Sequence, residues 1–237
     1  LRNITDDWMG FSLSGPASRT ILERLAHVDV SDEAFPFLAV RMLDVGTARA
    51  VVGRISLTGE LGYEIAVPTN QHRTLLQQLR EAGQESGLRL VGDRAIDSLR
   101  LEKAYGIWNA EFTQAYTPGM CGLDRFVAFD KGNFIGREAA LRERGEGAAQ
   151  QLVLLEVDAG DADASADDGI WIGDRRVGFV TSGAYGHHVK KSLALAYVDR
   201  DVIEPAVDLD IYIVGEARTA RILPAAPYDP TSSKLRC

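Results

Sequence analysis

The chain has 237 residues, of which 46% are hydrophobic, 25% charged and 8% aromatic, fractions typical of a globular protein. This length is enough for one large domain or two small ones with a buried core. The net charge is −8 and the pI about 5.1, and an acidic surface argues against nonspecific binding to nucleic acid or to an anionic membrane. No stretch has the apolar length of a membrane span.

Cysteines, histidines and acidic residues give no pattern of metal ligands. Cys121 and Cys237 are too far apart for a disulfide framework, which predicts a reducing, cytoplasmic setting. His187 and His188 are adjacent and have no ligand cluster beside them. The acidic stretch 158–168 lacks the glycine and glutamate of a calcium loop and is expected to be a solvated loop. We therefore expect no metal site.

The first half of the chain is expected to mix helices and strands. Ser14 and Pro16 predict the start of a helix, with Ser14 as its cap. Periodicity and turn residues then predict, in order, a helix Ala17–Val28, strands Phe37–Val45, Ala48–Leu57 and Tyr63–Val67, a helix from Thr69 or Asn70 to Ser86, a strand Leu88–Val91 and a helix capped by Asp93. Residues 105–136 are predicted to be mostly loop, followed by a short helix Arg137–Arg144.

The second half is predicted to consist of short strands. They are Leu152–Val157, Ile170–Ile172, Val177–Thr181, Leu193–Val198, Leu209–Val214 and Thr219–Leu223. Six such strands indicate a small antiparallel barrel or sandwich. The predicted class is α+β, with one domain over 1–147 and a β domain over 148–237.

Common motifs for nucleotides and hydrolysis are absent from the sequence. It has no dinucleotide fingerprint, no phosphate-binding loop, no nucleophile elbow and no zinc-protease motif. A dinucleotide or triphosphate site within the chain is therefore not expected.

Residues 53–68 form the first segment that suggests a binding site. Two predicted strands flank a glycine-bounded turn, which places Glu60 at the turn and Glu64 in the following strand. A strand glutamate beside such a turn can accept hydrogen bonds from a planar ring that carries amines. The alternative is a glutamate that faces only solvent.

Residues 97–108 form the second segment. Arg100, Lys103, Tyr105 and Trp108 lie where a predicted helix passes into a loop. They predict either an aromatic pocket with a cationic rim, suited to a flat heterocycle with carboxylates, or a helix end whose aromatics close the core.

Both segments resemble parts of the glycine cleavage T-protein (aminomethyltransferase) family. The motifs that carry the resemblance occur in the family's order: Leu13-Ser-Gly-Pro16, Phe35-Pro-Phe37, Thr58-Gly-Glu-Leu-Gly-Tyr-Glu64, Ser98-Leu-Arg-Leu-Glu-Lys103, Thr117-Pro118, Gly122-Leu123, Phe134-Ile-Gly-Arg-Glu138, Val180-Thr-Ser-Gly183, Lys191-Ser-Leu-Ala194 and Tyr228-Asp-Pro230. Within the family, the chain is most similar to the folate domain of dimethylglycine and sarcosine dehydrogenases. That similarity rests on the segment from Ser98 to Trp108, on Tyr185-Gly-His187, and on Ile96 at a position where glycine cleavage proteins have arginine.

The resemblance implies a folate-binding aminomethyltransferase-like domain followed by a C-terminal barrel. It implies tetrahydrofolate as cofactor, with its pterin held by Glu64, and makes Tyr63, Tyr105 and Trp108 candidates for the pocket wall. It also implies a small N-methyl amine as the donor, such as dimethylglycine or sarcosine. FAD would belong only to a separate flavin dehydrogenase domain or subunit, which would be the partner.

The sequence departs from the family at three places. Leu57 stands where folate users often have tyrosine, and Gly119-Met120-Cys121 replaces an apolar-Glu-Ala run. The upstream segment with the family's catalytic aspartate does not appear, so no catalytic residue is assigned. The chain is expected to be either part of a flavin-dependent dehydrogenase or a partner to one. Two other hypotheses stay open: a folate-dependent demethylase for another methyl donor, and a non-catalytic scaffold that keeps the fold.

Overall fold

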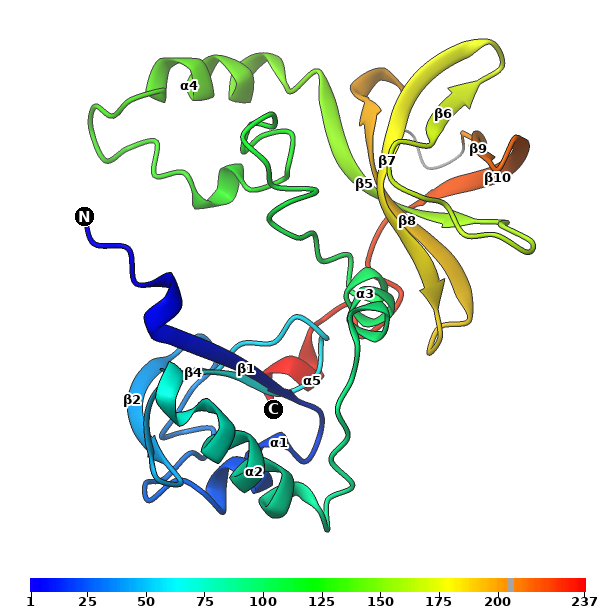
Figure 1. Ribbon diagram of the computed structural model, residues 1–237. Helices are drawn as coiled ribbons and strands as arrows, with labels where there is room; N and C mark the ends of the chain where they lie inside the picture. The colour runs from blue at the N-terminus through cyan, green and yellow to red at the C-terminus, as the bar shows by residue number, and fades with distance from the viewer. Residues whose placement is uncertain (204–206) are drawn as a thin grey trace. The chain divides into compact units, whose positions relative to one another are not determined.

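The computed structural model describes residues 1–203 and 207–237 (Figure 1). Contacts divide the chain into two compact units. The first, called here the sheet unit, comprises Leu1–Ile96 and Thr231–Cys237. The second, the barrel unit, comprises Asp97–Pro230. The division into 1–147 and 148–237 stays a prediction.

The sheet unit is built on a four-stranded antiparallel sheet. In the order β1-β4-β3-β2, its strands are Trp8–Ser14, Gly62–Pro68, Ala48–Gly53 and Val40–Val45. Helices α1 (Ser18–Glu23) and α2 (His72–Gly83) share a hydrophobic core with one face of this sheet. Short 3₁₀ turns η1 (Thr5–Asp7) and η2 (Thr69–Gln71) precede β1 and α2, and α5 (Ser233–Arg236) belongs to the C-terminal segment.

Strand β1 is not predicted by the sequence analysis, because Gly10 and Ser12 interrupt its apolar pattern. The predicted helix 17–28 is too long. Gly46 donates to the carbonyl of Leu25, and Ala26 forms a bridge to Val45, so the chain leaves α1 to contact the β2–β3 turn.

Ser14 does not cap α1, since its hydroxyl lies 3.1 Å from that of Ser56. The predicted strand 88–91 is also wrong. Leu88 folds back against Gly83, while Leu90 and Val91 are exposed, so no strand forms there.

The barrel unit contains a closed antiparallel barrel. Its strands, in the order β10-β5-β8-β7-β6-β9, are Glu216–Leu223, Gln150–Val157, Lys191–Asp199, Arg175–Gly186, Gly169–Ile172 and Leu209–Ile213. The helical elements of this part of the chain are α3 (Asp93–Glu102), η3 (Asp124–Phe126), α4 (Arg137–Glu146) and η4 (Arg200–Val202). The α+β class with a C-terminal antiparallel barrel is therefore confirmed.

The acidic stretch 158–168 is only partly the solvated loop that we expected. Ala159 and Ala164 are buried and belong to the barrel core. Asp163 accepts a hydrogen bond of 2.6 Å from Ser192, and Asp161 pairs with Arg218. The small alanines allow this loop to pack on the barrel while its carboxylates remain at the surface.

In the described part of the chain, no helix combines the length and the apolar character needed to cross a membrane. Among the same residues, no group of three or more His, Cys, Asp or Glu is placed to hold a metal ion.

Gly178 is a sensitive point of the barrel. A Cβ at this position would lie 2.3 Å from the carbonyl oxygen of Tyr197 on the neighbouring strand. We expect Gly178→Ala to lower the free energy of unfolding by about 1–3 kcal/mol, because backbone must move to admit the methyl group. Urea denaturation followed by circular dichroism measures this. Gly145→Ala is the matched control, since its Cβ would meet nothing and alanine favours α4; an equal loss in both variants would contradict the argument.

Candidate functional site

The face of the sheet opposite α1 and α2 carries Glu64 among small and apolar residues. The strand register places Glu64 of β4 between Ser12 of β1 and Gly53 of β3, with Val40 of β2 next along the row. The adjacent row contains Gly10, Ala66, Val51 and Met42. Val40 and Met42 are 67% and 55% exposed. The result is a flat, apolar surface of mostly small side chains with the carboxylate of Glu64 near one end.

The carboxylate of Glu64 is exposed but incompletely hydrated. Partial burial raises its pKa above the ordinary glutamate value, and a hydrogen bond from Ser12 opposes that rise. A carboxylate in this setting has acceptor capacity for a ligand, and a ligand that donates hydrogen bonds would replace the hydration it lacks.

Tyr63, a predicted pocket-wall residue, points to the other face of β4. Its side chain has no exposed surface, and its ring lies 5.9 Å from that of Phe35 in the core of the sheet unit. Its hydroxyl accepts a hydrogen bond of 3.3 Å from Arg19. Alternation along the strand explains the difference, because adjacent residues of a strand face opposite sides.

The turn between β3 and β4 is held by hydroxyl groups and by a glycine. Ser56 and Thr58 side chains lie 2.9 Å apart, and Ser56 also reaches Ser14 of β1. Gly62 must lack a side chain, because its Cβ would lie 2.7 Å from the Cβ of Ser56. This close approach sets where β4 begins, and so where Glu64 lies.

Arg100 and Lys103 do not form the cationic rim that was one of the two alternatives for this segment. Each residue is only 3% exposed and is paired inside the barrel unit. Arg100 donates to Asp97 at 2.8 Å and to the carbonyl of Tyr105 at 3.1 Å. Lys103 donates to the carbonyl of Asp229 at 2.6 Å, and 3.7 Å separates its Nζ from the Asp229 carboxylate. These cations anchor the barrel unit internally.

The two aromatic candidates of the same segment are placed differently from each other. Tyr105 is partly buried, and the Nζ of Lys103 lies 5.8 Å from its ring centroid. Trp108 is 81% exposed in the following loop. The structure thus brings Tyr105 together with Arg100 and Lys103, while Trp108 extends into solvent. A ligand-contacting role for Tyr105 or Trp108 stays a prediction.

Ser98 and Glu102 of α3 fix the hairpin that joins β7 to β8. Ser98 donates to the carbonyl of Tyr185 at 2.8 Å and accepts from the backbone N–H of His187 at 3.1 Å. Glu102 is buried and accepts from the backbone N–H of His188 at 2.8 Å. The two histidine side chains are exposed, and the backbone of their loop is tied to α3.

Glu111 is an important residue that the sequence analysis missed. It is fully buried and accepts hydrogen bonds of 2.6 Å from both Thr181 and Ser182, and one of 2.8 Å from the N–H of Ile107. A bulge in β7 between positions 180 and 182 lets both hydroxyl groups reach the same carboxylate. Arg100 lies 3.8 Å away. The only sequence signal is an acidic residue directly between the apolar Ala110 and Phe112.

Cys121 lies in the same network, where its recorded contacts among the described residues are the hydroxyl of Tyr197 and the carbonyl of Glu111. Its sulfur is 3.1 Å from the hydroxyl of Tyr197, which donates to the carbonyl of Glu111 at 2.7 Å. Burial raises the pKa of Tyr197, with further increases from Cys121. The tyrosine therefore remains a neutral donor.

Comparison with protein families assigns both parts of the chain. The family model of the GCVT N-terminal domain matches residues 1–131, and that of the glycine cleavage T-protein C-terminal barrel domain matches residues 150–229. The chain belongs to the glycine cleavage T-protein family. The resemblance found in the sequence is confirmed, including its closeness to dimethylglycine dehydrogenase.

The relatives of this family member include larger oxidative enzymes. Dimethylglycine dehydrogenase of Mus musculus is 34% identical over 100% of this chain, and the match covers 28% of the mouse protein. The sarcosine oxidase subunit alpha of Rhizobium meliloti is 32% identical over 99% of this chain and 25% of its own length. The chain thus spans about a quarter of these proteins.

Aminomethyltransferases match over more of their own length. That of Thermoanaerobacter pseudethanolicus is 31% identical over 94% of this chain and 60% of its own length. The crystal structure of the aminomethyltransferase of Bartonella henselae covers 94% of this chain and 60% of its own, with a TM-score of 0.81 and 23% identity. This structural likeness supports the fold.

Glu111 allows a direct test of the network it organises. We expect Glu111→Gln to lower the free energy of unfolding by about 2–4 kcal/mol, because the buried Arg100 loses a compensating charge and the hydroxyls of Thr181 and Ser182 lose a charged acceptor. Urea denaturation gives the value. Glu138→Gln, at an exposed position of α4, is the control, and a loss below about 0.5 kcal/mol for Glu111→Gln would show that the carboxylate is not needed.

Proposed function

We propose that this chain binds tetrahydrofolate and forms the one-carbon transfer part of a flavin-dependent N-methyl amine dehydrogenase. The donor would be a small N-methyl amine such as dimethylglycine or sarcosine. Support comes from the family, from relatives named dimethylglycine dehydrogenase and sarcosine oxidase subunit alpha, and from a relative named 4-methylaminobutanoate oxidase (formaldehyde-forming), of Paenarthrobacter nicotinovorans, that is 31% identical over 94% of this chain.

The observation that carries the proposal is the surface around Glu64. A pterin is a flat ring with amine and ring N–H donors on one edge, so its recognition needs an acceptor beside a flat apolar surface. Glu64 supplies the acceptor. Gly53 in the row of Glu64 and Gly10 in the adjacent row carry no side chains, so the surface beside the carboxylate stays flat, and a Cβ at Gly10 would meet nothing within 4 Å. The residues present therefore fit the group.

In this proposal, the chain contributes binding and orientation more than acid–base chemistry. When bound, tetrahydrofolate supplies the amine nitrogens that accept the one-carbon unit. Glu64 holds the donor edge of the ring, and the apolar rows of β2 and β3 exclude water from one side of it. Fixing the acceptor in one orientation favours capture of a reactive carbon unit over its loss to solvent.

The oxidation that releases the carbon unit is assigned to a different part of the assembly. The chain has no dinucleotide fingerprint, and it corresponds to about a quarter of the length of the oxidative relatives. We therefore propose that FAD belongs to a partner domain or subunit, which passes the carbon unit to the folate on this chain.

Glu64→Gln tests the central contact. We expect the affinity for tetrahydrofolate to fall about tenfold to a hundredfold, because a charged acceptor is worth roughly 1.5–3 kcal/mol per hydrogen bond. Isothermal titration calorimetry under anaerobic conditions measures the change. Glu23→Gln, at an exposed position on α1, is the matched control. Unchanged affinity in Glu64→Gln would remove Glu64 from the site.

The same contact predicts a pH dependence. Burial raises the pKa of Glu64, and only the ionised carboxylate accepts hydrogen bonds from the ring. Affinity should therefore be full above this raised pKa and fall as the pH is lowered through it. The profile of Glu64→Gln should lack that step. Identical profiles for the two proteins would contradict the assignment.

Titration with candidate donors distinguishes the hypotheses about substrate. The proposal predicts that a partner-containing enzyme turns over N-methyl amines and forms 5,10-methylene-tetrahydrofolate. Turnover only with a sulfonium or aryl ether donor would favour the hypothesis of a folate-dependent demethylase for another methyl donor. In that case, Leu57, which is 36% exposed, would contribute to a less polar binding surface. A folded chain that binds no folate would favour the scaffold.

A further inference from the structure

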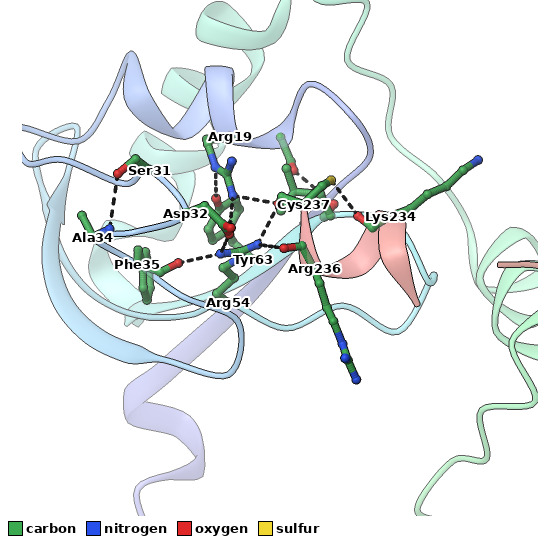
Figure 2. A network of polar contacts seen from close by, with 12 residues as sticks. Arg19, Ser31, Asp32, Ala34, Phe35, Arg54, Tyr63, Lys234, Arg236 and Cys237 are labelled. Carbon is green, nitrogen blue, oxygen red and sulfur yellow. Dashed lines mark hydrogen bonds and ion pairs between the residues drawn. The ribbon is translucent and has the colours of Figure 1, made fainter. Parts of the chain in front are cut away.

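A buried arginine of the sheet unit is paired with the C-terminal segment. Arg54 follows β3 and is completely buried. One terminal nitrogen, Nη1, pairs with Asp32 and donates to the carbonyl of Phe35 at 2.9 Å. The other, Nη2, donates to the carbonyls of Arg236 and Cys237 at 2.9 and 2.7 Å (Figure 2). Both recorded acceptors of Nη2 therefore come from residues 231–237.

A second arginine holds the same segment and contacts the strand of Glu64. Arg19 of α1 donates to the carbonyl of Cys237 at 2.9 Å and to the hydroxyl of Tyr63 at 3.3 Å (Figure 2). Tyr63 is the residue before Glu64 in β4. Two guanidinium groups thus converge on one carbonyl, and one of them links that carbonyl to the start of the binding strand.

The C-terminal segment also contacts the turn between β3 and β4. The Nζ of Lys234 lies 3.9 Å from the carboxylate of Glu60 in that turn, and Leu235 is 5% exposed. The C-terminal segment therefore contacts the connection between β3 and β4 at two places: at Arg54, directly after β3, and at Glu60, shortly before β4.

We propose that residues 231–237 are a positioning segment that holds the turn 54–61, and with it Glu64, in the geometry needed to bind folate. The inference rests on the proposed function in one respect, the identity of the ligand. The positioning itself depends only on the contacts of Arg54, Arg19 and Lys234.

The charges of the cluster explain why the segment is needed. Asp32 is the side-chain carboxylate recorded beside the two guanidinium groups, at 3.5 Å from Arg19, and backbone oxygens of Phe35, Arg236 and Cys237 supply the remaining acceptors. A buried guanidinium that loses its acceptors must either become hydrated or move. For Arg54, movement displaces the backbone at the beginning of the turn. Loss of the segment should therefore loosen the turn and leave the barrel unaffected.

The test compares the full chain with a variant that ends at Pro230. Hydrogen–deuterium exchange should become at least about tenfold faster for amides 56–64 and stay unchanged for β5 and β8 of the barrel. Tetrahydrofolate affinity should fall by a similar factor. A synthetic peptide with the sequence of residues 231–237, added under reducing conditions, should restore slow exchange and affinity together.

Arg54→Lys provides the second variant, in case the shortened chain does not fold. Lysine keeps the charge but cannot bond four acceptors as the guanidinium fork does, so it should reproduce the faster exchange at 56–64. Arg49→Lys, at an exposed position of β3 paired with Asp44, is the matched control.

The outcomes separate positioning from simple stabilisation. Unchanged exchange at 56–64 in both variants would overturn the proposal, as would a peptide that restores the melting temperature but not the affinity. If the full chain binds no folate, the proposed function fails, and the exchange measurement still decides whether the segment positions the turn.

Discussion

Buried charged groups must find their partners within the protein, and in this chain that requirement connects segments that are distant in sequence. Arg54 joins the end of β3 to Asp32, Phe35 and the last two residues of the chain. Glu111 performs the same task in the barrel unit, where it connects a loop to the bulge of β7. Each group would carry a large desolvation cost if a partner were lost. The C-terminal segment of the sheet unit and the loop around Glu111 in the barrel unit are therefore fixed by electrostatics as much as by hydrophobic packing.

Adjacent residues of β4 face opposite sides of the sheet, so one side packs in the core and the other side carries the proposed ligand contact. Residues such as Tyr63 and Ile65 fill the core shared with α1 and α2, while Glu64 and Ala66 face the other side. One strand thus supplies both the hydrophobic anchor and the proposed ligand contact. The side chain of Glu64 is set by its neighbours in the core, because moving β4 would disturb the packing of Tyr63.

The sequence predicted the regular elements well where polarity alternates, as in β4, and where short apolar runs are bounded by turn residues, as in the barrel strands. It failed where tertiary contacts override local preference: α1 is shortened by the bridge from Ala26 to Val45, and residues 88–91 follow the surface. For the candidate site, pattern analysis identified the turn and Glu64. It could not foresee that Arg100 and Lys103 are paired internally, because their partners, Glu111 and Asp229, lie 11 and 126 positions further along the chain. Nor could it find Glu111, whose role depends on a bulge that no local sequence rule specifies.

The discontinuity of the sheet unit has a consequence for synthesis of the protein. Its four strands and two helices are complete once residue 96 has been made, but the acceptors of Arg54 Nη2 are in residues 236 and 237. At a translation rate of about 5–20 residues per second, the intervening chain takes on the order of ten seconds to produce. During that time, the nascent sheet unit holds a guanidinium that is not fully paired. The unit should therefore stay looser until residues 236 and 237 have been made and have folded onto it.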